Sequence, residues 1–553
     1  MKITLTVLAL WLCVAASPLF AQEHKPSAEA KADYDQASQA ISKGFSGDPK
    51  EFTKAVELLQ KAIKLDPDYY DAHEEYARAY EFAAAPDAVS DDDKKAKAAK
   101  AQSEKAEKEV EQQYVKLAAE HPDKAVYLFV LGEILDYADP DRAVNYYKQA
   151  IKLDPKCGPA YSMLATAAEE HGDLDLSREY AKKAYEAWPD DEHFWGGYIS
   201  SYTAVPTPEN LEKAKEIELE GAAKFPEEAV HMLSYTAGRT TDEAQARQLY
   251  ELVKQRFPKD AKGYTMVPLF NLYLKSDQSK ALELANEMVR VDPKDKTWPL
   301  LKDHAQALHD ADALLARGDF DKALTMLEAV KLPGHHATEG RWLELAKAQA
   351  LAGKGDVANA YANLLKEYAS TPSDEVQAAL KTYGQKLGKS DANVAAEINE
   401  QRAAAAKPGL PFTLTDYATG KPVSLSDYKG RVVLVNFWYP KCGPCRGEFP
   451  YLQMSLEKYK SQGFAILAIN GEPPQDSWVM PLINGWHLGF TPLKGNDEVV
   501  SEYKVRGFPS NFLYGADGKI YPMPDQVRPW TLREFELQVE SLLHEANMTS
   551  TAQ

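Results

Sequence analysis

Two cysteines near the C-terminal end of the 553-residue chain have the clearest potential for chemistry. They lie in the stretch Cys442-Gly443-Pro444-Cys445, and no other pair among the four cysteines is close in sequence. This spacing suits a redox-active disulfide, but it also suits half of a zinc site or a chance pair in a turn. Zinc needs four ligands, and the region offers only His487 and His544 besides the pair, so we predict no metal.

The sequence around the pair predicts a strand before it and a helix after it. The run RVVLVNFWY, residues 431–439, is rich in β-branched and aromatic residues, as buried central strands are. A helical pattern, a second strand, a hairpin and a final helix are predicted at 448–462, 463–470, 510–522 and 531–546. A CxxC at a strand-to-helix turn is typical of thioredoxin-like domains. Backbone N–H groups at that helix start would stabilise a Cys442 thiolate, and the stiff Gly443-Pro444 turn would let Cys445 reach back.

The segment VVLVNFWYPKCGPCRGEFP resembles the TlpA/ResA branch of the thioredoxin family. The match is carried by the two cysteines and by Asn436, Phe437, Trp438, Arg446, Glu448 and Pro450. A second segment, YKVRGFPSNFLYGADGK, is similar to the family signature in which a cis-proline faces the disulfide, which implies this role for Pro509 after Phe508. The resemblance covers roughly residues 408–546. It implies exported thiol–disulfide exchange, often reductive, with electrons from a membrane thiol donor and no cofactor. A peroxiredoxin is disfavoured because the usual Thr ahead of the reactive cysteine is missing.

Two positions depart from the family pattern. Lys441 stands where the family usually has Trp, so it would lower the Cys442 pKa and change the docking surface, unless it simply faces solvent. Asn436 stands where thioredoxin has a buried Asp that transfers protons, a task that Asn cannot perform. Glu472, in AINGEPP, lies where ResA-like proteins place an active-site acid, although an ordinary loop Glu is an equal alternative.

Upstream of this domain, prolines recur at a nearly constant interval after helical patterns. The interval is 32 to 37 residues along the series Pro122, Pro155, Pro189, Pro226, Pro258 and Pro293. A period near 34 with Pro after the second helix resembles the tetratricopeptide (TPR) repeat. Such arrays form α-solenoids that usually bind partner proteins, and the alternative is a spacer or dimerisation scaffold.

The chain is therefore predicted to be multidomain, with an all-α TPR-like solenoid followed by an α/β thioredoxin-like domain. We expect a signal peptide at 1–21, the solenoid at 28–400, a linker at 401–410, the thioredoxin-like domain at 411–546 and a flexible tail at 547–553. The N-terminal run MKITLTVLALWLCVAASPLFAQ indicates export to the periplasm or medium, or an uncleaved membrane anchor. A formal charge of −19 argues against nucleic-acid binding, which needs a basic surface.

The predicted function is that of an exported thiol–disulfide oxidoreductase, most simply a reductase of protein disulfides. Cys442 would attack the substrate disulfide and Cys445 would resolve the mixed disulfide. The solenoid would dock a protein partner or hold two copies together. The alternatives are a TPR-based scaffold with a weakly active module, or a dithiol oxidant. Cys157, in DPKCGPA, is expected to be a bystander, and otherwise a third redox partner.

Overall fold

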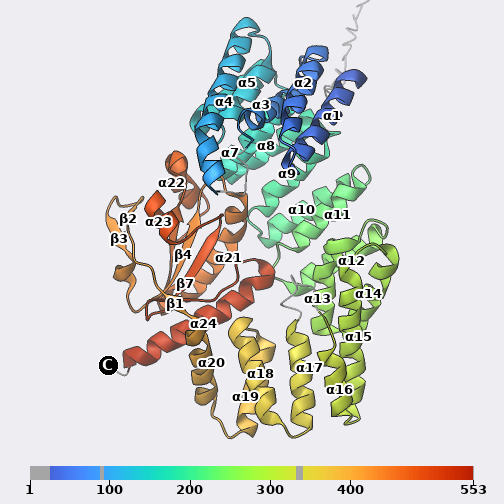
Figure 1. Cartoon of the computed structure of the whole chain (residues 1–553), viewed down its shortest axis with the longest axis vertical. Coiled ribbons are helices and arrows are strands. Elements are labelled where there is room, and N and C mark those ends of the chain that lie inside the picture. Colours follow the sequence, from blue (N-terminus) through green and yellow to red (C-terminus); the bar gives the residue numbers. More distant parts are fainter. Residues whose placement is uncertain (1–24, 87–92, 332–339, 552–553) are drawn as a thin grey trace, which may run out of the picture. The chain divides into compact units, whose positions relative to one another are not determined.

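The computed structural model describes residues 25–86, 93–331 and 340–551, so the predicted signal segment lies outside the described residues. A long series of helices precedes an eight-stranded sheet with its own helices (Figure 1), which is the predicted fold class. The helices of the first part are α1 Ala28–Phe45, α2 Lys50–Leu65, α3 Tyr70–Ala84, α4 Asp93–Glu120, α5 Ala125–Leu135, α6 Pro140–Leu153, α7 Gly158–Glu170, α8 Leu174–Ala187, α9 Glu192–Thr203, α10 Pro208–Gly221, α11 Pro226–Ala237, α12 Glu243–Arg256, α13 Val267–Ser276, α14 Gln278–Val291, α15 Thr297–Ala316, α16 Phe320–Glu328, α17 Gly340–Gly353, α18 Val357–Ser370, α19 Asp374–Lys386 and α20 Asp391–Ala405.

Two compact units make up the chain. Unit 1 holds the described residues up to Ile134 together with Ala143–Ser162 and Lys182–Phe194. Unit 2 holds Leu135–Arg142, Met163–Ala181 and the described residues from Trp195 onward. The turns after α5 and after α7 thus belong to the same unit as the sheet.

The helices of unit 1 form because apolar residues recur at helical spacing. In α2, Phe52, Ala55, Leu59 and Ala62 are all buried, and their spacing of three and four residues places them on one face. Gly44 of α1 lies against the Phe52 ring, where a Cβ atom would approach the ring carbon to 2.6 Å. The small residue therefore allows the first two helices to pack closely, as helical repeats require.

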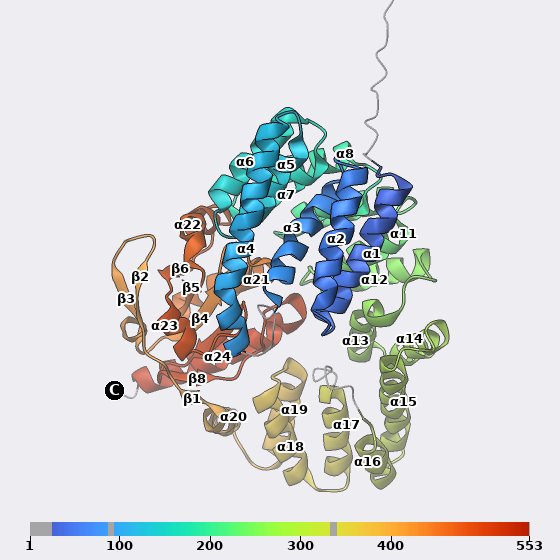
Figure 2. The same cartoon turned by 45° about the horizontal axis from the view of Figure 1, so that its top comes forward.

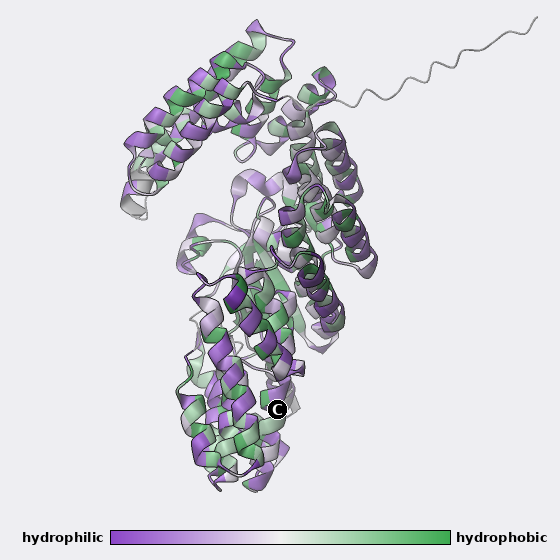
Figure 3. Ribbon diagram, turned by 90° about the vertical axis from the view of Figure 1, so that its right-hand side faces the viewer, coloured by the Kyte–Doolittle hydropathy of each residue, from purple (hydrophilic) through white to green (hydrophobic). Residues whose placement is uncertain are grey.

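The helical repeats of unit 2 continue as antiparallel pairs from α13 to α20, which Figure 2 shows in a second view. Three turns of this series contain a glycine with positive φ, namely Gly318, Gly355 and Gly388. This left-handed conformation ends a helix without the steric penalty that a Cβ atom would bring. Hydrophobic and hydrophilic residues alternate around these helices (Figure 3), as expected for helices buried on one side only.

The sheet runs in the order β1-β8-β7-β4-β5-β6-β2-β3. Its strands are β1 Lys407–Pro408, β2 Thr413–Asp416, β3 Pro422–Ser424, β4 Val432–Trp438, β5 Phe464–Asn470, β6 Thr491–Lys494, β7 Ser510–Tyr514 and β8 Lys519–Tyr521, and its helices are α21 Gly443–Tyr459, α22 Asp476–Gly485, α23 Asp497–Glu502 and α24 Pro529–Thr551. Strand β4 is parallel to β5 and antiparallel to β7. Every residue of β4 and β5 is buried, as their continuous apolar sequences predict.

Successive side chains of β4 enter two separate cores. Val432 and Leu434 pack with α21 and α24 on one face, whereas Val433 and Val435 pack on the other face. The first core also contains the two cysteines of the CxxC stretch. The central strand thus holds the start of α21 against a closely packed apolar layer.

Two segment boundaries differ from the predicted ones. The predicted linker 401–410 is divided between α20, which ends at Ala405, and β1, whose Lys407 pairs with Ile520. The alanine-rich run contains no helix breaker before Pro408, and Arg402 is anchored over the Tyr521 ring at 5.7 Å. The predicted flexible tail 547–553 is helical through Thr551, as part of α24.

Within the described ranges, no helix combines the length and the apolar character needed to cross a bilayer.

Candidate active site

The CxxC pair occupies the start of α21, four residues after the end of β4. Cys442 is the N-cap residue of the helix, and its Sγ accepts a hydrogen bond from the Cys445 N–H at 3.2 Å. Gly443 and Pro444 form the first turn, where a proline is favourable because no intrahelical partner exists for its missing N–H. Cys442 and Cys445 are joined in a disulfide with their Cα atoms 5.2 Å apart.

The loop of Phe508 and Pro509 lies at the same edge of the sheet. Strand β7 pairs with β4 so that Ser510 lies opposite Phe437, and Pro509 directly precedes Ser510. The Phe508–Pro509 peptide bond is cis. The Phe508 ring contacts the Tyr439 ring edge-on at 5.2 Å, three residues before Cys442. Trp438, the residue before Tyr439, is fully buried, and its ring centroid lies 5.1 Å from that of Phe449.

A buried carboxyl group lies one helical turn beyond Cys445. Glu448 is fully buried and accepts hydrogen bonds from Asn436 Nδ2 at 2.9 Å and from the Val527 N–H at 3.2 Å. Asn511 Nδ2 donates to both of its carboxylate oxygens, at 3.3 and 3.2 Å. Burial raises the pKa of Glu448 to about 7, although these hydrogen bonds and Arg528 oppose the rise. Asn436 therefore positions an acid and need not be one.

Glu472, the acid proposed from the sequence, is not part of this group. It is half-buried and precedes the short 3-10 helix Pro473–Gln475, and its N–H donates to Asn470 Oδ1 at 3.1 Å. In the sequence, Glu448 stood out only as a residue of the family motif. Its spacing from Cys445, three positions along one helix, was the signal that could have identified it, because residues i and i+3 share a face.

Lys441 neither faces solvent nor stands alone beside the disulfide. Its side chain is 7% exposed, and Nζ lies 2.8 Å from Glu170 and 2.9 Å from Asp136. The same ammonium group lies over the Trp478 ring at 5.0 Å. Burial would lower the pKa of Lys441, but Glu170 and Asp136 outweigh this effect and raise it. The expected cation is thus present, already paired with carboxylates of unit 2.

Arg446, the residue after Cys445, is paired in the same way. Its side chain is 9% exposed, with Nε 3.0 Å from Glu169 and Nη1 3.3 Å from Glu170. Nη1 also donates to the Pro440 carbonyl at 2.7 Å. Burial raises the pKa of Glu170, while Lys441 and Arg446 oppose that rise. Two cations therefore flank the disulfide, and three carboxylates from the helical repeats compensate them.

Cys157 lies in unit 1 and is a free, buried cysteine. Burial raises the pKa of its thiol to about 12, which leaves little thiolate near neutral pH.

In the parts of the chain that the structure describes, no three His, Cys, Asp or Glu side chains are grouped so that they could hold a metal ion.

Two segments of the chain match families of known proteins. Residues 405–523 match the AhpC/TSA family, and residues 135–192 match the tetratricopeptide repeat. The thiol-disulfide oxidoreductase ResA of Bacillus thuringiensis subsp. konkukian is 33% identical over 122 residues, which are 22% of this chain and 69% of that protein. The chain belongs to the ResA family of thiol–disulfide oxidoreductases.

A second relative supports this assignment, and a solved structure is also similar. ResA of Geobacillus kaustophilus is 37% identical over 125 residues, which cover 22% of this chain and 71% of that protein. A crystal structure of a putative thiol:disulfide interchange protein DsbE from Chlorobium tepidum is 29% identical and covers 25% of this chain and 96% of its own, with a TM-score of 0.24. The predicted family, fold class and enzyme class are confirmed. The ResA-like domain is the catalytic part of a chain that also carries TPR repeats.

Proposed function

We propose that this ResA-family chain is an exported enzyme that reduces protein disulfides through Cys442 and Cys445. The observation that carries the proposal is the position of Cys442 at the N-cap of α21, with Cys445 in disulfide distance. At this position the helix dipole and the Cys445 N–H both favour a thiolate on Cys442.

The exchange proceeds in two balanced steps. The Cys442 thiolate attacks one sulfur of a substrate disulfide, which forms a mixed disulfide and releases the other substrate sulfur as a thiolate. Cys445, once deprotonated, attacks the Cys442 sulfur, which releases the second substrate thiolate and leaves Cys442–Cys445 oxidised. Two electrons pass to the substrate, and a thiol donor must supply two electrons to restore the dithiol.

Glu448 is the group that can receive the Cys445 proton. It lies on the same helix face, and its pKa of about 7 matches a group that exchanges protons near neutral pH. Asn436 and Asn511 hold its carboxylate oxygens, so they act as positioning residues. The loop of Phe508 and Pro509 would hold the substrate backbone beside the disulfide, as an added edge strand.

Export, the membrane thiol donor and the reductive direction belong to the same proposal. Export is supported by the N-terminal run MKITLTVLALWLCVAASPLFAQ, whose short charged start and apolar centre are typical of secretory signals. The TPR match over 135–192 supports protein–protein interaction, and we assign the repeats the task of docking a partner protein or a second copy.

Cysteine variants of the full chain test this mechanism. We expect Cys442→Ser to abolish reduction of disulfide-bonded insulin, because the attacking sulfur is lost. Cys445→Ser should accumulate a mixed disulfide at Cys442, visible as a thiol-sensitive band, because the resolving sulfur is lost. Cys157→Ser is the matched control and should retain full activity. Mixed disulfides in equal yield from Cys442→Ser and Cys445→Ser would contradict the assignment of the nucleophile.

A redox titration decides the direction. A midpoint near the roughly −270 mV of thioredoxin supports a reductant, whereas one near the roughly −120 mV of DsbA makes the chain an oxidant.

A further inference from the structure

Residues of the helical repeats pack around the start of α21, where the disulfide lies. Cys442 is only 3% exposed, although the proposed mechanism requires it to meet a second protein. Leu174, the first residue of α8, and Ala204 and Val205, directly after α9, pack against the core that contains both cysteines. All of these residues belong to unit 2.

Hydrogen bonds hold these repeat residues against the first part of α21. Arg239 donates to the Gly447 carbonyl at 2.8 Å, and Tyr451 Oη donates to the Arg239 carbonyl at 2.8 Å. Trp486 Nε1 donates to the Glu169 carbonyl at 3.1 Å. The turn after α7 lies directly on the backbone of α22, since a Cβ atom on Gly485 would come within 2.3 Å of the Gly172 carbonyl oxygen.

The centre of the contact is electrostatic. Lys441 precedes Cys442 and Arg446 follows Cys445, and both cations are bound by Glu170. Glu169 binds Arg446 from the same turn, and Asp136 binds Lys441 from the turn after α5. We call Glu169 and Glu170, which end the last helical turn of α7, the acidic turn. Because these pairs are largely buried, solvent and salt screen them far less than exposed ion pairs.

The buried cations place a requirement on any protein that takes the place of the acidic turn. When the turn leaves, water can solvate Lys441 and Arg446. A substrate protein that then covers the same face removes this water again, and a buried cation without a partner is strongly unfavourable. A substrate that presents carboxylates beside its disulfide satisfies both cations, whereas a neutral or basic substrate does not.

We propose that the acidic turn is an internal competitor of the substrate on the face formed by Lys441, Cys442 and Arg446, and that the preferred substrates carry carboxylates next to their disulfide. This inference rests on the proposed function, because it names the substrate class of the same site. Displacement of the turn gates access to Cys442, and the two cations select the protein that displaces it.

The test uses the full-length reduced protein and two synthetic peptides, each with one intramolecular disulfide. Glu flanks the cysteines in one peptide and Gln flanks them in the other. We expect the wild-type protein to reduce the Glu peptide about tenfold faster, because charge-assisted hydrogen bonds to both cations are regained. Lys441→Gln/Arg446→Gln should remove this preference. Equal rates with both peptides would overturn the inference.

A second variant tests the cover itself. In the reduced protein, Glu169→Gln/Glu170→Gln should raise the rate of Cys442 alkylation by iodoacetamide about tenfold, since the turn is released. The matched control is Glu227→Gln/Glu228→Gln, an adjacent pair at the start of α11 with the same change of charge, which should leave the rate unchanged. An unchanged rate in the folded Glu169→Gln/Glu170→Gln variant would overturn the inference.

A measurement on the wild-type protein covers the case in which this variant does not fold. A Glu peptide with serines in place of its cysteines should speed amide hydrogen exchange in residues 163–181, while the corresponding Gln peptide should not. No difference between the two peptides would contradict the competition.

Hydroxyethyl disulfide, which is small and uncharged, distinguishes a failure of the proposed function from a failure of the inference about the acidic turn. If the reduced Glu169→Gln/Glu170→Gln protein, in which the turn is released, fails to exchange with it, the proposed function itself fails. If exchange occurs but the peptide preference and the alkylation difference are absent, only the inference fails.

Discussion

At the scale of single residues, burial distinguishes the two carboxyl groups considered for the proposed proton transfer. Glu448 follows Cys445 by three positions, and Glu472 is the acid that was expected from the sequence. Glu448 is the one enclosed by α21, β7 and the backbone of Val527. Its pKa of about 7 follows from that enclosure, because burial disfavours the charged form.

This pKa predicts a pH dependence of stability. The pKa of Glu448 is raised from 4.5 to about 7, so the folded protein binds more protons than the unfolded chain between these values, and stability falls as pH rises through that window. The shift corresponds to about 3 kcal/mol. Glu448→Gln cannot ionise, so its free energy of unfolding relative to the wild type should improve by about this amount from pH 4 to pH 8.

Urea unfolding of the oxidised proteins at both pH values measures the effect. Glu472→Gln is the matched control, a carboxyl-to-amide change outside the buried group, and it should follow the wild-type profile. A Glu448→Gln profile parallel to that of the wild type would show that the carboxyl group titrates in its ordinary range.

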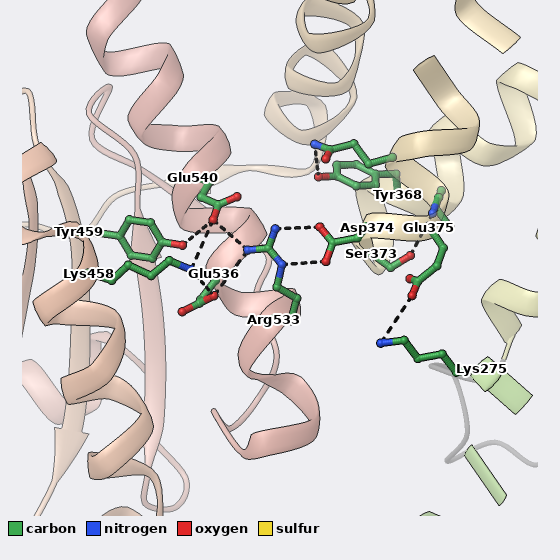
Figure 4. A network of polar contacts seen from close by, with 12 residues as sticks. Lys275, Tyr368, Ser373, Asp374, Glu375, Lys458, Tyr459, Arg533, Glu536 and Glu540 are labelled. Atoms are coloured by element: carbon green, nitrogen blue, oxygen red, sulfur yellow. Dashed lines mark hydrogen bonds and ion pairs between the residues drawn. The ribbon is translucent and has the colours of Figure 1, made fainter. Parts of the chain in front are cut away.

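At the scale of elements, the last helix of the ResA-like domain is tied to the repeats by a charged network (Figure 4). Arg533 of α24 forms a two-pronged pair with Asp374 of α19, at 2.8 and 2.7 Å. The hydrogen bonds from Arg533 lower the pKa of Asp374. Asp374 also lies in the first turn of α19, after the N-cap Ser373, where the helix dipole favours a negative charge.

We expect the Arg533–Asp374 pair to contribute little despite its good geometry. The side chains are 45% and 54% exposed, and exposed pairs are typically worth about 0.2–1 kcal/mol. A double-mutant cycle with Arg533→Met and Asp374→Asn should give a coupling energy in this range that declines in 1 M salt, where the Debye length is roughly 3 Å. A salt-independent coupling above about 2 kcal/mol would mean that the network behaves as a buried one.

At the scale of the whole molecule, the later repeats and the ResA-like domain belong to one compact unit. The sequence suggested a linker at 401–410, yet α20 occupies its first half, to Ala405, and β1 joins the sheet from Lys407. Ser541 of α24 also hydrogen-bonds Asn399 of α20 at 2.9 Å. The segment that connects the helical repeats to the ResA-like domain therefore consists of regular secondary structure that packs on its neighbours.

Resistance to trypsin tests this continuity. Arg402 is 2% exposed, and Lys407 is followed by proline, so Arg402 is the one good tryptic site in 401–410. We expect the native protein to resist cleavage there, since cutting requires α20 to unfold locally. Lys262, which is exposed and directly precedes the short 3-10 helix Gly263–Met266, should be cut readily and serves as the positive control. Early release of a fragment beginning at Ala403 would restore the linker interpretation.

The sequence by itself determined the features that depend on neighbours along the chain. The CxxC at a strand-to-helix turn, the apolar run of β4 and the proline interval of the repeats are local patterns, because strand, helix and cap preferences act within a few residues. They were sufficient for the fold class, the family and the enzyme class. Cys442 and Cys445 could be named for the same reason.

Only the tertiary structure decided how the site is surrounded. Lys441 and Glu170 are separated by 271 positions, and Arg446 and Glu169 by 277, so no local pattern could pair them. The choice between Glu448 and Glu472 depended on burial, which the packing of α21 against the sheet sets. The same holds for Arg402, which contacts Tyr521 from the part of the expected linker that belongs to α20. Charge compensation and desolvation act through space, and the folded chain alone determines which groups share that space.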